Sequence, residues 1–376
     1  MQELIYITII LGASLFVTVI SRRIGIPVVV GQILIGIILT PSMLGLIHGT
    51  HTLDFLAEIG VILLMFLAGL ESDFDLLKKY MKPSLVIAIF SVLVPLLIYA
   101  GVTTYIGYKL PVAIFYGIVF SATSVSITVE VLQEYGKLSS RAGAVILGAA
   151  VVDDILAVLV LSFFMSSQTS SGNIGLKLVM QVIFLLFLYL AFKWLIPIIS
   201  HFVGRLDIYG KYMSTSLLIC FIFSLLANSV GMSAVIGAFF AGLAIGQTDM
   251  AEKIEVAISQ IAYVFFIPIF FVTIALPIDF SSLFRKPLFL IFLIVVAVLS
   301  KFLPSYFVSR GFKFSKHESL LIGSGMVSRG EMALIVAQIG LSTKLIGTTM
   351  YSELVVVIVF STLIAPFLIK TTLDES

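Results

Sequence analysis

The sequence predicts an all-α membrane protein with about thirteen transmembrane helices, an inverted-topology repeat and two interrupted helices that cross. Of the 376 residues, 60% are hydrophobic and only 11% are charged, whereas soluble globular proteins carry about 25% charged residues. Long apolar runs alternate with short polar connectors, and small polar or ionisable residues interrupt several of these runs. Lipid is therefore the expected solvent for much of the surface.

The order of elements follows from the apolar runs, because a transmembrane helix needs about 20 mainly apolar residues. No basic segment precedes the first run and no clean cleavage site follows it, so we expect a first spanning helix rather than a signal peptide. We expect one membrane unit over residues 1–376, with no soluble regulatory domain. The runs predict helices at about 4–20, 27–46, 54–70, 84–106, 111–132, 142–166, 176–199, 213–230, 232–247, 254–277, 287–309, 318–341 and 350–369.

The distribution of basic residues predicts the orientation. In the thirteen-helix scheme, fourteen of the 22 Lys and Arg residues fall in connectors on one side and five on the other, and the remaining three, Lys193, Lys301 and Arg329, lie within spans. Cytoplasmic loops carry an excess of Lys and Arg. We therefore expect a multi-pass protein of the cell membrane with its N-terminus outside and its C-terminus in the cytoplasm.

An internal repeat is predicted from residues that recur 206 positions later. It has two copies, at about 1–166 and 213–370, joined by a linker helix at about 176–199. Seven spans separate equivalent helices, so the second copy would enter the membrane inverted. A second interpretation, compatible with the first, is that the glycines let helices pack closely. The matched pairs are Gly25 and Gly231, Gly31 and Gly237, Gly36 and Gly242, Asp73 and Asp279, Leu77 and Leu283, and Gly117 and Gly323.

The most informative residues are ionisable groups inside the predicted spans, because each costs about 2.5–3.5 kcal/mol at the centre of a membrane helix. Asp153 and Asp154 lie near the middle of the run 142–166. Adjacent helical residues point about 100° apart, so one carboxylate can face an aqueous cavity while the other faces a neighbouring helix. Two close, buried carboxylates repel each other, so at least one should hold either a proton or a cation. The alternative is a pair that only holds helices together.

Lys301 is a third ionisable residue inside a predicted span, the run 287–309. We expect a buried ion pair with one of the two aspartates, which protonation or cation binding would break. The alternative is that the long side chain reaches the membrane surface and leaves its ammonium in water.

Two segments, 121–126 and 323–331, are rich in small polar residues and lie at equivalent places in the repeat, where Arg329 matches Thr123. This composition favours interrupted membrane helices whose freed carbonyls and hydroxyls line an ion site. The charges of Arg329 and Glu331 would then offset the half-helix dipoles. The alternative is that Ser and Thr only bond to their own helix turns.

Several classes of function are disfavoured. The net charge of +2, without a basic stripe, argues against nucleic-acid binding. Cys220 is the only cysteine, so a cysteine metal cluster and an intrachain disulfide are excluded. The four histidines fall in polar connectors, and no nucleophile–base pairing is visible. We therefore expect no enzyme activity and no cofactor.

The chain resembles the NapA-type sodium/proton antiporters of the second monovalent cation–proton antiporter family, which also includes GerN-like and Kef-like exchangers. The similarity covers nearly the whole chain. The motifs that carry it are Gly31-Gln32-Ile33-Leu34-Ile35-Gly36 with Pro41-Ser42, Phe66 to Glu71, Ser121 to Ser126, Val152-Asp153-Asp154, Lys301, and Met326 to Glu331.

The resemblance implies electrogenic exchange of Na⁺ for H⁺ by a homodimer in which a core domain moves against a dimerisation domain. It implies that Asp154 binds Na⁺ or a proton in turn and that Asp153 pairs with Lys301. It also implies that Thr123 and Ser124 form the unwound helix beside the site, stabilised by Arg329 and Glu331. The transported ions, Na⁺ (with Li⁺) and H⁺, and the membrane lipid are then the partners.

The sequence departs from the family pattern at Gln32, where many relatives carry an acid, and no nucleotide-binding domain of the Kef type is expected. Exchange of K⁺ for H⁺ stays open, because oxygen ligands serve both cations. A Na⁺-coupled symporter of an organic anion and a passive cation channel are further alternatives, although the buried acidic pair with a lysine favours proton coupling.

Overall fold

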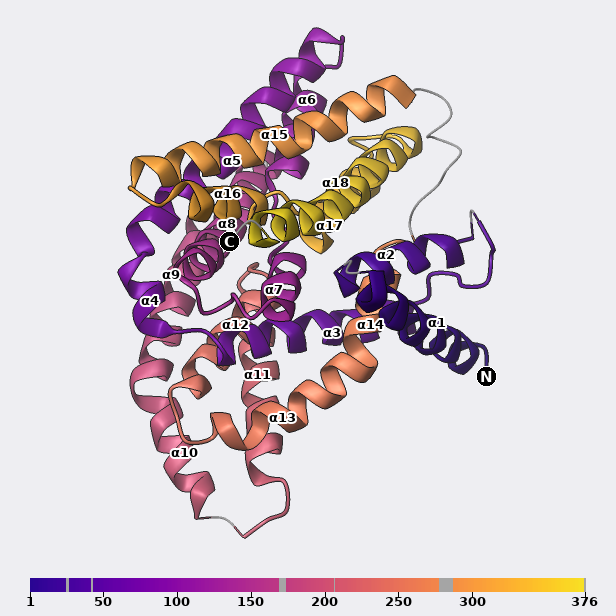
Figure 1. Cartoon of the computed structure of the whole chain (residues 1–376). Coiled ribbons are helices and arrows are strands. Elements are labelled where there is room, and N and C mark those ends of the chain that lie inside the picture. Colours follow the sequence, from indigo (N-terminus) through magenta and orange to yellow (C-terminus); the bar gives the residue numbers. More distant parts are fainter. Residues whose placement is uncertain (25–26, 42, 169–173, 206, 277–286, 375–376) are drawn as a thin grey trace. The chain divides into compact units, whose positions relative to one another are not determined.

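The computed structural model describes the chain apart from residues 25–26, 42, 169–173, 206, 277–286 and 375–376 (Figure 1). The part described is helical and contains no strand, which confirms the all-α prediction. In chain order the helices are α1 (Gln2–Ile24), α2 (Val28–Leu39), α3 (His51–Leu70), α4 (Phe74–Lys79), α5 (Met81–Tyr105), α6 (Leu110–Ser121), α7 (Val125–Glu134), α8 (Arg141–Gln168), α9 (Ile174–Leu190), the π-helical turn η1 (Ala191–Leu195), α10 (Ile196–Gly204), α11 (Lys211–Ser229), α12 (Ala234–Gly246), α13 (Ala251–Ile261), the π-helical turn η2 (Ala262–Phe266), α14 (Ile267–Thr273), α15 (Pro287–Gly311), α16 (Lys316–Gly325), α17 (Glu331–Ser342) and α18 (Thr348–Asp374).

Ten helical segments in the described part of the chain are long and apolar enough to cross a membrane, and each coincides with a predicted span. Shorter apolar helices at Val28–Leu39, Ala234–Gly246 and Met332–Leu341 fall in the other three predicted ranges. The ten long segments are Gln2–Ile24, His51–Leu70, Met81–Tyr105, Leu110–Glu134, Arg141–Leu161, Val179–Gly204, Lys211–Ser229, Lys253–Thr273, Pro287–Gly311 and Thr348–Leu373.

Two features depart most clearly from the sequence prediction. The second helix ends at Leu39 instead of continuing to residue 46. Pro41 disfavours helical backbone at the residue that precedes it, Thr40. The short helix α4 follows α3 where the sequence predicts a connector. Its six residues are too few to form a span, so the order of the predicted spans is unchanged.

The chain forms two compact units. Unit 1 comprises Met1–Asp54, Leu76–Ala157 and Phe271–Ser376, and unit 2 comprises Phe55–Asp75 and Val158–Phe270. Within unit 1, α5 packs against α6 and α15, and α15 packs against α16 and α18. Within unit 2, α11 packs against α12 and α13. All of the predicted ion-binding residues belong to unit 1.

Helices approach closely at glycines that are related by the 206-residue offset. A Cβ placed on Gly36 would lie 2.6 Å from the carbonyl oxygen of Val272, and one on Gly117 would lie 2.5 Å from that of Leu96. The glycine 206 positions later contacts a residue that also lies 206 positions from the first partner, after it in two pairs and before it in one. The contacts are Gly31 with Val17 and Gly237 with Phe223, Gly36 with Val272 and Gly242 with Phe66, and Gly117 with Leu96 and Gly323 with Phe302. Gly25 and the segment 279–283 lie outside the described residues.

Candidate ion-binding site

The acidic pair lies in the middle of α8, an uninterrupted helix from Arg141 to Gln168. The side chains of Asp153 and Asp154 are both buried, with 0% and 3% of their surfaces exposed. A buried carboxylate needs hydrogen bonds or a cationic partner to offset its lost hydration. The residues around α8 supply both.

Lys301 of α15 supplies the positively charged partner. Its Nζ lies 3.0 Å from Asp153 Oδ2 and 3.3 Å from Oδ1, and both side chains are fully buried. Because the ammonium ends inside unit 1, its side chain does not extend to the surface as the alternative interpretation required.

A break between α6 and α7 brings a hydroxyl to this ion pair. Ala122 (φ −64°, ψ 140°) and Ser124 (φ −97°, ψ 113°) have extended backbone, so the chain leaves the helix for three residues. Thr123 Oγ1 donates a hydrogen bond to Asp153 Oδ2 and accepts one from Lys301 Nζ over 2.6 Å. Thr123 thus connects both members of the ion pair.

A second break, at residues 327–330, separates α16 from α17 and carries Arg329. Arg329 is fully buried. Its Nε and Nη2 donate to the carbonyl oxygen of Phe120 over 3.1 and 3.0 Å, and Nη1 donates to that of Val327 over 3.1 Å. Phe120 lies in the last turn of α6, where carbonyls lack intrahelical partners and the helix dipole is negative. The guanidinium therefore donates hydrogen bonds to a carbonyl that would otherwise lack a partner at this end of α6.

The two breaks are also joined directly. The backbone N–H of Ser124 donates to the carbonyl oxygen of Ser328 over 2.9 Å, and Ser328 Oγ donates to the carbonyl oxygen of Ser124 over 2.6 Å. Thr128 Oγ1 donates to the carbonyl oxygen of Gly325 over 2.7 Å. Ser121, by contrast, bonds to Ile118 in its own helix. The hydroxyls of Thr128 and Ser328 therefore connect the two breaks instead of only returning to their own turns.

The structure therefore gathers most of the residues that the sequence singles out. Asp153, Thr123 and Lys301 are in direct contact, and Asp154 lies beside them. Glu331 begins α17, but its side chain lies outside the part of the chain that the structure describes.

Sequence reasoning missed one residue of this cluster, Ser91 of α5. Its Oγ accepts a hydrogen bond from Lys301 Nζ over 2.7 Å, and Ser91 is fully buried. A single serine in an apolar run gives no signal, because serine in membrane helices commonly bonds to its own helix.

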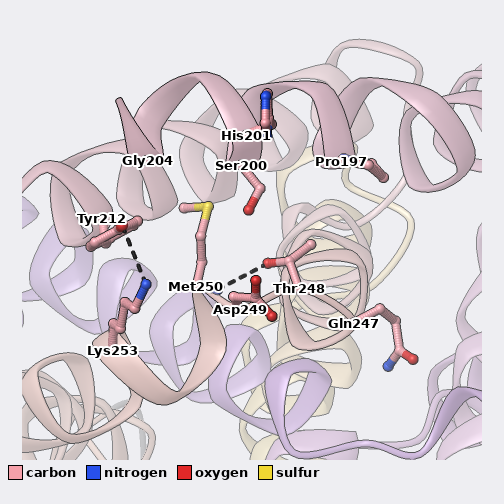
Figure 2. A pocket seen from close by; sticks show the side chains of 10 residues that line it. All are labelled: Pro197, Ser200, His201, Gly204, Tyr212, Gln247, Thr248, Asp249, Met250 and Lys253. Carbon is pink, nitrogen blue, oxygen red and sulfur yellow. Dashed lines mark hydrogen bonds between the residues drawn. The ribbon is translucent and has the colours of Figure 1, made fainter. Parts of the chain in front are cut away.

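Unit 2 contains a separate cavity of about 470 Å³ that involves none of the predicted ion-binding residues. Figure 2 shows its lining, in which Lys253 Nζ donates to Tyr212 Oη over 3.3 Å and Asp249 lies next to Thr248. No group of three or more His, Cys, Asp or Glu side chains suited to a metal ion occurs among the residues that the structure describes. The buried cluster of unit 1 is therefore the better candidate for a monovalent cation, because it places carboxylate, hydroxyl and carbonyl oxygens together.

Comparison with known proteins places the chain among cation–proton exchangers. Residues 10–375 match the family described as "Sodium/hydrogen exchanger, transmembrane". The chain is 44% identical over 368 residues to a Na⁺/H⁺ antiporter of Enterococcus hirae, and the match covers 96% of each of the two chains. It is 37% identical over 353 residues to the Na⁺/H⁺-K⁺ antiporter GerN of Bacillus cereus, covering 94% of this chain and 91% of GerN.

The fold is also similar to that of a solved structure, the sodium proton antiporter MjNhaP1 of Methanocaldococcus jannaschii at pH 8. The TM-score is 0.73, and the match covers 100% of this chain and 98% of the other at 18% identity.

Proposed function

The chain belongs to the family of transmembrane sodium/hydrogen exchangers, and from this membership we propose that it exchanges Na⁺, or Li⁺, for protons at Asp154 and Asp153 by alternating access. The observation that carries the proposal is the buried ion pair of Asp153 and Lys301, closed by Thr123 and placed beside Asp154. Buried ionisable groups in a membrane protein line ion and proton pathways.

The exchange rests on competition. A carboxylate that holds a proton has lost the charge that attracts a cation, so the cation and the proton displace each other. In the proposed cycle a cation that enters from one side takes oxygen ligands from Asp154 and Asp153 and releases Lys301 from its pair. Protons that arrive on the other side restore the pair. Because Lys301 contributes a charge to this competition, we propose electrogenic exchange.

The proposed architecture is a thirteen-helix inverted repeat with copies at about 1–166 and 213–370, a linker at about 176–199, and the N-terminus outside. The three pairs of glycine contacts that recur at the 206-residue offset support it, since the partner recurs together with the glycine. The resemblance to NapA-type antiporters supports a homodimer in the cell membrane.

Exchange of K⁺ is a second candidate on the same site. It is favoured by the similarity to GerN, a protein named for Na⁺/H⁺-K⁺ antiport. A Na⁺-coupled symporter is less well supported, because the Lys301 ammonium that could bind an anionic substrate is already paired with Asp153.

The test is transport in liposomes that contain a trapped pH dye, with Na⁺, Li⁺ or K⁺ added outside. We expect Na⁺ to make the interior alkaline in the wild type, Asp154→Asn to abolish this response, and Asp249→Asn, an exposed residue of unit 2, to retain it. The response to K⁺ decides between the two cations. A wild type that moves no protons, or an Asp154→Asn variant that matches it, would refute the proposal.

A further inference from the structure

We infer that Ser91 is a positioning residue for cation exchange, holding the Lys301 ammonium in place while Asp153 binds the cation. The inference rests on the proposed function and deepens it. It arises from a contact that the sequence does not signal, between α5 and α15, which pack against each other in unit 1 (Figure 1).

The first step is the hydrogen-bonding capacity of Lys301. An ammonium has three N–H donors and no acceptor. Three groups surround it: Ser91 Oγ at 2.7 Å, Thr123 Oγ1 at 2.6 Å, and the Asp153 carboxylate at 3.0 and 3.3 Å. The two neutral hydroxyls are closer than the charged partner. Lys301 is therefore held by three groups, of which the ion pair is only one.

The second step is the position of each partner. Asp153 lies on α8, where its oxygens are needed for the cation, and Thr123 donates to the same carboxylate. Ser91 approaches the ammonium from α5, which carries neither aspartate. When the carboxylate turns to the cation and Thr123 follows it, the contact from Ser91 continues to hold Lys301.

The third step compares the two states. Without a cation, Lys301 has a carboxylate and two hydroxyls as partners, whereas in the cation-bound state, once Thr123 has followed the carboxylate, it depends on the Ser91 hydroxyl. An unsatisfied buried donor is costly, and more so when it is charged. Loss of the Ser91 hydroxyl therefore raises the energy of the cation-bound state more than that of the empty state, and cation affinity falls.

The experiment measures proton flux in proteoliposomes as a function of Na⁺ concentration. We expect Ser91→Ala to raise the KM for Na⁺ by about 3- to 10-fold with Vmax within about twofold of the wild type. Ser91→Thr, which keeps the hydroxyl, should restore a KM near the wild-type value. The matched control is Ser84→Ala on the same helix, since Ser84 is also buried but bonds to the carbonyl oxygens of Tyr80 and Val145.

The outcomes separate the inference from the proposed function. If the wild type lacks a Na⁺ response, the proposed function fails. If the wild type responds and Ser91→Ala has the same KM, or Ser91→Thr is as impaired as Ser91→Ala, the positioning role is refuted. Should Ser91→Ala not fold, Ser91→Cys, with a weak acceptor of similar size, should also raise KM. The Na⁺ concentration that gives half-maximal thermal stabilisation in detergent should shift in parallel, and an unchanged midpoint would count against the inference.

Discussion

Ser124 and Ser328 are bonded to each other in both directions, although 204 residues separate them. Ser124 donates its backbone N–H to Ser328, and Ser328 returns its side-chain hydroxyl to Ser124. Each thereby satisfies a backbone group that its own interrupted helix leaves open, which is the condition for irregular backbone inside a membrane. The two breaks depend on each other for their hydrogen bonds.

We predict that Ser328→Ala destabilises the protein by about 1–3 kcal/mol, because the buried carbonyl of Ser124 loses a donor. Thermal unfolding in detergent is the measurement. Ser361→Ala is the control, since this buried serine bonds only to Ile358 in its own helix turn among the contacts found in the described chain. Equal stability of the two variants would mean that the link between the breaks contributes nothing.

The ion pair gives a second prediction. Lys301→Met should destabilise the protein by about 3–5 kcal/mol, because it leaves the buried charge of Asp153 without its cation. The double variant Asp153→Asn with Lys301→Met should recover much of that loss, since replacing both charges of a buried pair is often close to neutral. Unfolding free energies of the two single variants and the double variant give the coupling. A double variant whose loss equals the sum of the single losses would contradict the pairing.

Arg329 gives a third prediction. Arg329→Lys keeps the positive charge but loses the planar fork that donates twice to the carbonyl of Phe120. We expect a lower thermal stability for Arg329→Lys and a lower one still for Arg329→Met. Unfolding in detergent checks the order, and a lysine variant as stable as the wild type would show that charge alone suffices.

The repeated glycine contacts give a fourth prediction. Gly36→Ala and Gly242→Ala should both destabilise the protein, because the added Cβ meets the backbone of Val272 and Phe66, respectively. Gly12→Ala and Gly101→Ala, in α1 and α5, meet nothing within 4 Å, so the higher helix propensity of alanine should make them neutral or stabilising. Melting temperatures of the four variants test the contrast. Four similar temperatures would remove this support for the repeat.

The order of the helices could be predicted from the sequence because burial in lipid demands long apolar runs, as in α5 and α15. Residues in the candidate site could be identified for the same reason. Asp153 and Lys301 are too costly in a membrane to stand alone, so each indicates a partner of the opposite charge.

The remainder of the site could not be predicted, because its partners are ordinary groups. The carbonyl oxygen of Phe120, which Arg329 contacts, exists at every residue and leaves no signature in the sequence. Ser91 has a similarly common side chain, which membrane helices tolerate at many positions. The choice of Asp153 over Asp154 as the direct partner of Lys301 depends on how α8 is rotated against α15, so its prediction comes from the family resemblance and not from the neighbouring carboxylates themselves.

Asp153 and Lys301 lie 148 residues apart in the sequence, and this separation sets the order in which the two partners are made during biosynthesis. The chain is made from its N-terminus, so α8 can be inserted before α15 has been translated. Thr123, only 30 residues from Asp153, is then the first partner available to the acid. A nascent or truncated chain that stops before α15 carries a carboxylate in the bilayer without its counterion. Translation of the last quarter of the chain is therefore what completes the charge balance, and shorter products keep an unpaired carboxylate by which cellular quality control can distinguish them.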